Sequence, residues 1–144
     1  MKARSRLLLP ILTILTVTAV SAASAQDSFL QGDAARALRR AETLLQQKHY
    51  QKAAAEFERA SELAGGSCAE CLLGVGRAYQ GAGQLDAALQ VTRMGLALVS
   101  GADERAEAFN QLGSLLALKG DREAAEEAFR KSRIQAEQAV TDAP

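Results

Sequence analysis

The chain has 144 residues, with 17 basic and 17 acidic side chains and a hydrophobic content of 48%. Its longest basic runs are the pairs Arg39-Arg40 and Arg130-Lys131. They are too short for the positive surface that phosphate backbones require, so we expect no nucleic-acid binding. Aromatic residues make up only 4%, the two prolines lie near the ends and alanine is abundant, a composition that favours helices throughout.

Residues 1–25 have the pattern of a secretory signal peptide. Lys2, Arg4 and Arg6 precede an apolar run over 7–20, and small residues follow at 23–25. We favour cleavage over a membrane anchor, because the uncharged stretch is barely long enough to span a bilayer and ends in small polar residues. The mature chain, 26–144, then has three more acidic than basic residues. We expect export by a Sec-type signal, either to a periplasm or as a secreted protein.

Three short triplets that break a helix recur at a regular interval after the signal. They are Lys48-His49-Tyr50, Gly83-Gln84-Leu85 and Gly120-Asp121-Arg122, separated by 35 and 37 positions. This interval is the period of stacked helix pairs. The longer second interval places two extra residues near 100–102, where we expect the third repeat to sit at a slightly different angle.

Small residues flank each triplet at fixed distances. Seven positions before each triplet lies Ala41, Gly76 or Gly113, and three positions after it lies Ala53, Ala88 or Ala125. We expect small residues to face small residues across each helix pair, because larger side chains at both positions would force the backbones apart.

These positions resemble the tetratricopeptide repeat. The third copy is the best match, the second is close, and the first has Arg40 where a large apolar residue is expected. Thr92 and Arg122 each replace an aromatic residue of the family pattern, and the closing prolines are absent. The matching residues are Phe109, Leu112, Gly113, Leu116, Gly120, Ala125, Phe129 and Ser132 in the third copy, Leu72, Val75, Gly76, Tyr79, Gly83, Leu85 and Ala88 in the second, and Leu44, Tyr50, Ala53, Phe57 and Ala60 in the first.

The resemblance implies an all-α fold, a right-handed solenoid of antiparallel helix-turn-helix repeats. Three repeats at about 34–66, 69–102 and 106–140 would fill the domain 26–144. On this alignment the first helices run near 34–48, 68–82 and 103–119. The second helices run near 51–64, 85–99 and 122–140, and the polar end of the last one suits a terminal face that meets water.

In this family one face of each first helix lines a concave groove. The resemblance therefore implies that the groove binds a peptide or helix of another protein, with leucines as anchors and Glu42, Arg77 and Asn110 orienting the ligand. The lysine and asparagine clamp that some relatives use for a terminal carboxylate is absent, so we expect no carboxylate-tail binding. The groove positions in this register are Leu38, Glu42, Leu45, Leu73, Arg77, Gln80, Asn110, Ser114 and Ala117.

Cys68 and Cys71 are the only cysteines and form a C-x-x-C pair. Ser67 and Glu70 have the spacing of a capping box, which predicts that a helix begins here with both thiols on one side. Three interpretations stay open, namely a disulfide, reduced buried thiols, and a redox-active or partner-linked pair. A disulfide closing so short a loop would stabilise the fold by clearly less than about 3 kcal/mol.

The sequence predicts no enzyme. His49 is the only histidine and lies in a tight turn, so no Ser-His-Asp set can be assembled. Gly74 and Gly76 lie within a predicted helix rather than in a phosphate loop. We expect no metal, because the single C-x-x-C lacks further ligands, and no cofactor or small-molecule substrate. Besides groove binding, two alternatives remain: a thiol-disulfide accessory protein using the cysteine pair, and an oligomer that self-associates through the ends of the array.

Overall fold

The computed structural model describes residues 31–141, and these residues form helices joined by short loops. The predicted all-α repeat fold is confirmed. The predicted signal peptide lies outside the described residues. None of the helices described is long and apolar enough to cross a membrane. The helices comprise residues 31–46 and then α2 (Tyr50–Leu63), α3 (Ala69–Gly81), α4 (Leu85–Leu98), α5 (Ala102–Lys119) and α6 (Arg122–Thr141).

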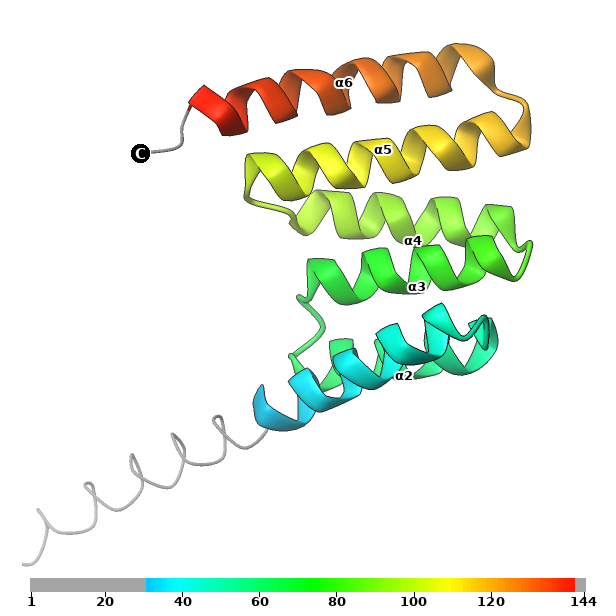
Figure 1. Ribbon diagram of the computed structural model, residues 1–144, viewed down its shortest axis with the longest axis vertical. Coiled ribbons are helices and arrows are strands. Elements are labelled where there is room, and N and C mark those ends of the chain that lie inside the picture. The colour runs from blue at the N-terminus through cyan, green and yellow to red at the C-terminus, as the bar shows by residue number, and fades with distance from the viewer. Residues whose placement is uncertain (1–30, 142–144) are drawn as a thin grey trace, which may run out of the picture.

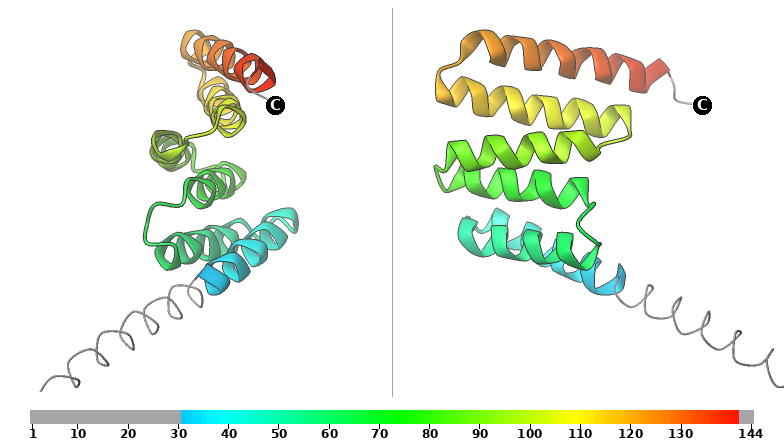
Figure 2. Two further views of the ribbon diagram at one scale, coloured as in Figure 1. Left: turned by 90° about the vertical axis from the view of Figure 1, so that its left-hand side faces the viewer. Right: turned by 180° about the vertical axis from the view of Figure 1, so that it is seen from behind.

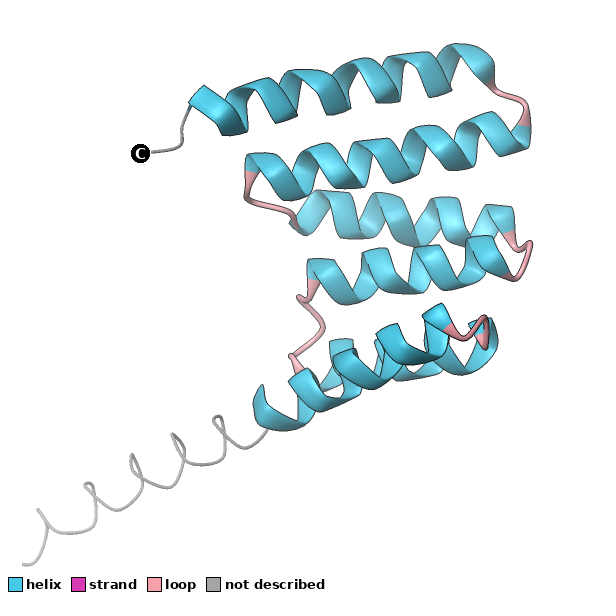
Figure 3. Cartoon of the chain, viewed as in Figure 1, coloured by secondary structure: helices cyan, strands magenta, loops and turns pink. Residues whose placement is uncertain are grey.

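The helices stack in chain order, each antiparallel to the one before (Figure 1). The connecting loops lie alternately at the two edges of the stack (Figure 3). Viewed from the side, α4 is set to one side of α3 and α5, and α3 and α5 are in contact with each other (Figure 2). The 31–46 helix and α6 lie at opposite ends of the stack, so each covers its neighbours on one side only (Figure 1).

The three predicted triplets are the turns within the helix pairs, and all three have the same backbone geometry. Their first residues, Lys48, Gly83 and Gly120, have φ of 61°, 77° and 90°. The next amide in each turn donates to a carbonyl five residues back: His49 to Leu44, Gln84 to Tyr79 and Asp121 to Leu116, at 2.9, 2.9 and 3.0 Å. This left-handed C-terminal motif satisfies the last carbonyls of the helix, which explains why glycine occupies two of the three positions.

Two of the small residues before the triplets, Gly76 and Gly113, make room for a larger side chain of the second helix. A Cβ added at Gly113 would lie 2.8 Å from the Phe129 ring, and one at Gly76 would lie 2.4 Å from Thr92 Oγ1. At Gly76 the nearest atom of Ala88 is its carbonyl oxygen, at 3.5 Å. Ala41 and Ala53 lie in one core cluster, both 0% exposed, and Gly76 contacts Ala88, as expected. At Gly76 and Gly113 the closest atoms belong in addition to Thr92 and Phe129, one turn further along the second helix.

Thr92, where the family pattern has an aromatic residue, leaves space for a buried polar contact between repeats. Gln111 of α5 is 8% exposed, and its Nε2 donates to Thr92 Oγ1 and to the carbonyl oxygen of Leu73, both at 3.0 Å. The contact joins α3, α4 and α5. A buried amide with satisfied hydrogen bonds fixes their relative positions more specifically than apolar contacts alone.

The loop with the two extra residues is held by side chains from α5. Glu104 Oε2 accepts from the Gly101 amide at 3.2 Å, and Arg105 Nη2 donates to the carbonyl oxygens of Val99 and Ser100 at 3.0 and 3.5 Å. Arg105 Nη1 also reaches Gln135 of α6 at 3.4 Å. The insertion is thus tied to the third repeat, and it forms one wall of the groove described next.

Candidate functional site

A groove of about 480 Å³ lies where the N-terminal halves of α3 and α5 meet the loop between α4 and α5. Leu73 and Val99, each 7% exposed, lie at its base, and Leu98 beside them is 44% exposed. A large aliphatic side chain left this open to water is available to a partner. The lining residues are Glu42, Ala69, Glu70, Leu73, Arg77, Leu98, Val99, Ser100, Glu104 and Glu107.

Among the described residues, Arg77 is the only basic one that lines this groove. Its Nη1 lies 3.1 Å from Glu107 Oε1, an ion pair that bridges α3 and α5. Its Nε is buried and has no hydrogen-bond partner among the described residues. A buried donor without an acceptor costs about 1–3 kcal/mol, and this Nε lies too deep for a partner in the groove to reach it.

The structure brings three of the predicted groove residues together, namely Glu42, Leu73 and Arg77. Leu38 and Leu45 are instead half-buried and pack against the core cluster around Phe57. That cluster joins the 31–46 helix to α2 and α3 and comprises Ala41, Ala53, Ala54, Phe57, Val75 and Ala78.

The remaining predicted positions lie outside the hollow. Gln80 is half-buried near the other end of α3, and Asn110 is exposed on α5. The Ser114 hydroxyl donates to the Asn110 carbonyl oxygen at 3.0 Å, one helical turn away. Ala117 is exposed further along α5. None of these residues lines the hollow that contains Arg77.

Sequence reasoning missed seven of the ten lining residues: Ala69, Glu70, Leu98, Val99, Ser100, Glu104 and Glu107. Glu70 and Glu107 occupy the same position in the second and third repeats, since each lies six residues before Gly76 or Gly113. The repeat register could therefore have found both. Leu98 and Glu104 flank the loop with the insertion, where the repeat period does not predict which residues line the groove.

The two cysteines are joined by a disulfide next to the groove, with Cα atoms 5.2 Å apart. The residue that caps α3 is Cys68 rather than Ser67, because Cys68 Sγ accepts from the Cys71 amide at 3.1 Å. The predicted capping box is therefore wrong by one residue. Cys71 is 2% exposed and Cys68 is half-buried, so the sulfurs lie partly within the cluster with Ala37 and Ala60.

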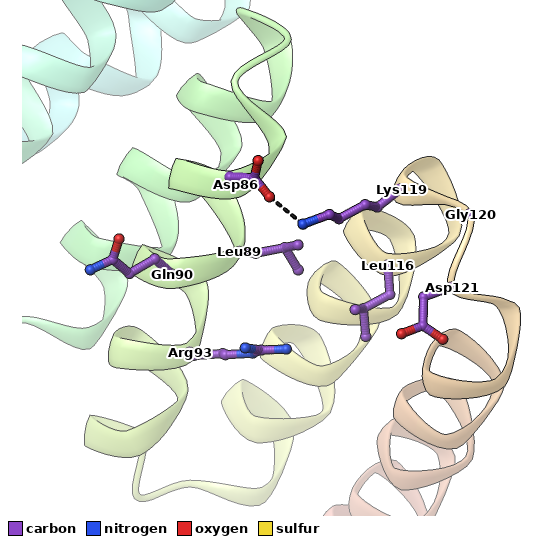
Figure 4. Close-up of a pocket in the computed structure, with 8 residues that line it drawn as sticks. All are labelled: Asp86, Leu89, Gln90, Arg93, Leu116, Lys119, Gly120 and Asp121. Carbon is purple, nitrogen blue, oxygen red and sulfur yellow. Dashed lines mark hydrogen bonds and ion pairs between the residues drawn. The ribbon is translucent and has the colours of Figure 1, made fainter.

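A second hollow lies between the start of α4 and the turn from α5 to α6 (Figure 4). Leu89 and Leu116, each 6% exposed, lie at its base, and Lys119 pairs with Asp86 across it. Arg93 and Asp121 complete a lining of two basic and two acidic groups. Because these charges balance and both leucines are covered, this hollow offers less to a partner than the groove.

Comparison with known proteins supports the repeat assignment. Residues 106–132 match the sequence family described as Tetratricopeptide repeat. No curated protein sequence matches the chain. The match falls on the third copy of the pattern, the one with the most complete set of family residues.

Two solved structures share the fold. One is the TPR domain of FLU from Arabidopsis, with a TM-score of 0.67 and 24% identity over 76% of this chain and 98% of that domain. The other is a double mutant of MamA from RS-1, with a TM-score of 0.63 and 24% identity over 75% of this chain. The chain spans 57% of the MamA structure. Residues 106–132 thus match one tetratricopeptide repeat, and the described residues share the fold of these repeat domains.

Proposed function

We propose that the groove between α3, α5 and the 98–102 loop binds a peptide or helix of another protein. Tetratricopeptide repeat domains are protein-protein interaction modules, and they are generally not enzymes. The observation that carries the proposal is the hollow itself, an apolar base with Leu98 open to water and Arg77 across from it. Partner segments commonly place an aliphatic anchor in such a pocket and surround it with polar contacts.

Photo-cross-linking tests this proposal at single positions. A benzophenone amino acid replaces Leu98 in one variant and Met94 in the other. The two side chains lie one turn apart on α4 and are similarly exposed, at 44% and 50%, but Met94 does not line the groove. After irradiation in the native cells, we expect cross-links to another protein from position 98 and few from position 94.

Three outcomes of the cross-linking separate the alternatives. Equal yields at both positions would contradict groove binding. Cross-links only between copies of this chain would indicate the self-associating oligomer instead. Cross-links to a partner that disappear in a Cys68→Ser/Cys71→Ser variant, while the variant remains folded, would indicate the thiol-disulfide accessory role.

We also propose that the protein is exported and that residues 1–25 are removed. The disulfide between Cys68 and Cys71 supports this, because disulfides persist in oxidising compartments and are rare in the cytosol. N-terminal sequencing of the protein isolated from its native cells is expected to begin near Gln26. A mature product that begins at Met1 would contradict export by cleavage.

A further inference from the structure

We infer that the segment that occupies this groove is cationic, with lysine or arginine side chains on either side of an aliphatic residue. The inference rests on the proposed groove function and specifies the chemistry of its partner. Four of the lining residues are glutamates and only one is basic, so the groove has an excess of three negative charges.

The excess of three already counts the one basic group, which is engaged by a glutamate of the same groove. Arg77 Nη1 lies 3.1 Å from Glu107, which leaves Glu42, Glu70 and Glu104. Within residues 31–141, none of these three forms an ion pair. Glu104 accepts one hydrogen bond from the Gly101 amide, which leaves its charge in place.

The carboxylates come from three separate elements that meet around the apolar base. Glu42 lies on the 31–46 helix, Glu70 on the first turn of α3 and Glu104 on the first turn of α5. In the part of the chain described, no three acidic, histidine or cysteine side chains are placed to hold a metal ion. Because the three carboxylates come from three different elements, their arrangement suits basic side chains spaced along an extended or helical segment.

An acidic partner is disfavoured by the same arrangement. A carboxylate brought to the groove would meet three like charges, and Arg77 could compensate only in part, because its Nη1 already pairs with Glu107. Like charges that face each other across an interface suppress the wrong partners. The groove therefore selects by repulsion as well as by attraction.

Peptide selection followed by binding measurements tests the inference. A random library of displayed twelve-residue peptides is selected on the protein expressed from its full sequence, and enriched peptides are labelled for fluorescence anisotropy. We expect enriched sequences with a net positive charge around one aliphatic residue, bound more weakly as salt increases. Glu42→Gln/Glu70→Gln should weaken binding by about 3- to 10-fold, since each exposed charge pair contributes a small factor.

A matched control removes the same charge elsewhere. Glu123→Gln/Glu126→Gln changes two exposed glutamates of α6, far along the chain from the groove, and is expected to leave affinity unchanged. Leu98→Ala tests the groove separately from its charge. Two outcomes would overturn the cationic inference but leave binding in the groove supported. In the first, Leu98→Ala weakens binding and Glu42→Gln/Glu70→Gln does not. In the second, the selected peptides are acidic or neutral.

The proposed function fails in a different way. If no peptide is enriched, or if enriched peptides are unaffected by both Leu98→Ala and the groove glutamate variant, the groove is not the binding surface and the inference falls with it. Binding that the α6 control weakens as much as the groove variant would show a general charge effect, which also overturns the inference.

Discussion

Single side chains set the distances between helices in this array, and Gly76 is the clearest case. Its missing side chain admits Thr92 Oγ1 and Gln111 Nε2, which would lie 2.4 and 2.7 Å from a Cβ. Both atoms belong to a buried hydrogen-bond contact that joins three helices. Glycine at position 76 therefore sets the distance between the helices and also leaves room for the buried hydrogen bonds.

Gly76→Ala is expected to destabilise the protein by about 1–3 kcal/mol through overpacking, although alanine alone favours a helix by about 1 kcal/mol over glycine. The measurement is urea unfolding followed by circular dichroism. Gly32→Ala is the control, because a Cβ there would meet no atom within 4 Å, and it should be neutral or slightly stabilising. A stabilising effect at Gly76 would show that the contact can shift at little cost.

Tyr79 makes a hydrogen bond between α3 and α2 whose effect can be measured. Its hydroxyl donates to Glu58 Oε1 at 2.8 Å. This hydrogen bond raises the pKa of Tyr79 above its usual value, with burial and the charge of Glu58 adding to the effect. Because the folded state holds the proton more tightly, the stabilisation is complete below about pH 10 and is lost as the pH rises through the folded pKa.

Ultraviolet absorbance titration can measure this pKa directly. The chain has two tyrosines and no tryptophan, so a Tyr50→Phe background leaves Tyr79 as the one phenol. We expect a raised pKa in that background and a lower one after adding Glu58→Gln. An unchanged value would mean that Glu58 is not the cause.

At the scale of helices, the sequence predicts where the turns lie but not how deeply each side chain on a helix face is buried. Residues 83 and 120 are glycines, and the left-handed turn that glycine favours ends each first helix where the triplets predicted. The position of a side chain on a helix face also follows from the period. How far a neighbouring helix covers that face depends on crossing geometry, which explains why Leu38 and Leu45 pack inward while Glu42 lines the groove.

The helix start at the cysteine pair shows a similar limit. Ser67 and Glu70 have the spacing of a capping box, yet a cysteine sulfur makes the capping contact one residue later. Sulfur is a weak acceptor, so sequence rules that rank serine first pointed to the neighbouring residue. The disulfide holds Cys68 where its sulfur faces the Cys71 amide.

Two double variants separate the disulfide from the cap. Cys68→Ser/Cys71→Ala removes the bond and keeps an oxygen acceptor at the cap, and it should cost clearly less than about 3 kcal/mol because the closed loop is short. Cys68→Ala/Cys71→Ala also removes the acceptor and should be less stable than the first variant by about 1 kcal/mol. Thermal unfolding of both, beside the wild type, gives the comparison, and equal stabilities would show that the cap contributes nothing.

At the scale of the whole molecule, the core is a series of small clusters rather than one interior. One cluster holds Phe57 and Val75 between the 31–46 helix, α2 and α3, and another holds Leu89 and Leu115 between α4, α5 and α6. Tyr79 packs against both. Each repeat is therefore stabilised mainly by its neighbours, as in other linear arrays.

Local destabilisation should then stay local. Leu115 is 0% exposed, and Leu115→Ala is expected to cost about 2–5 kcal/mol in the second cluster. Native-state hydrogen exchange should show faster exchange in α4, α5 and α6 with smaller changes in α2. Phe57→Leu, at a side chain that is also 0% exposed, should give the reverse pattern. Equal acceleration in every helix for both variants would show a single cooperative unit, because only then would loss of either cluster unfold the entire array.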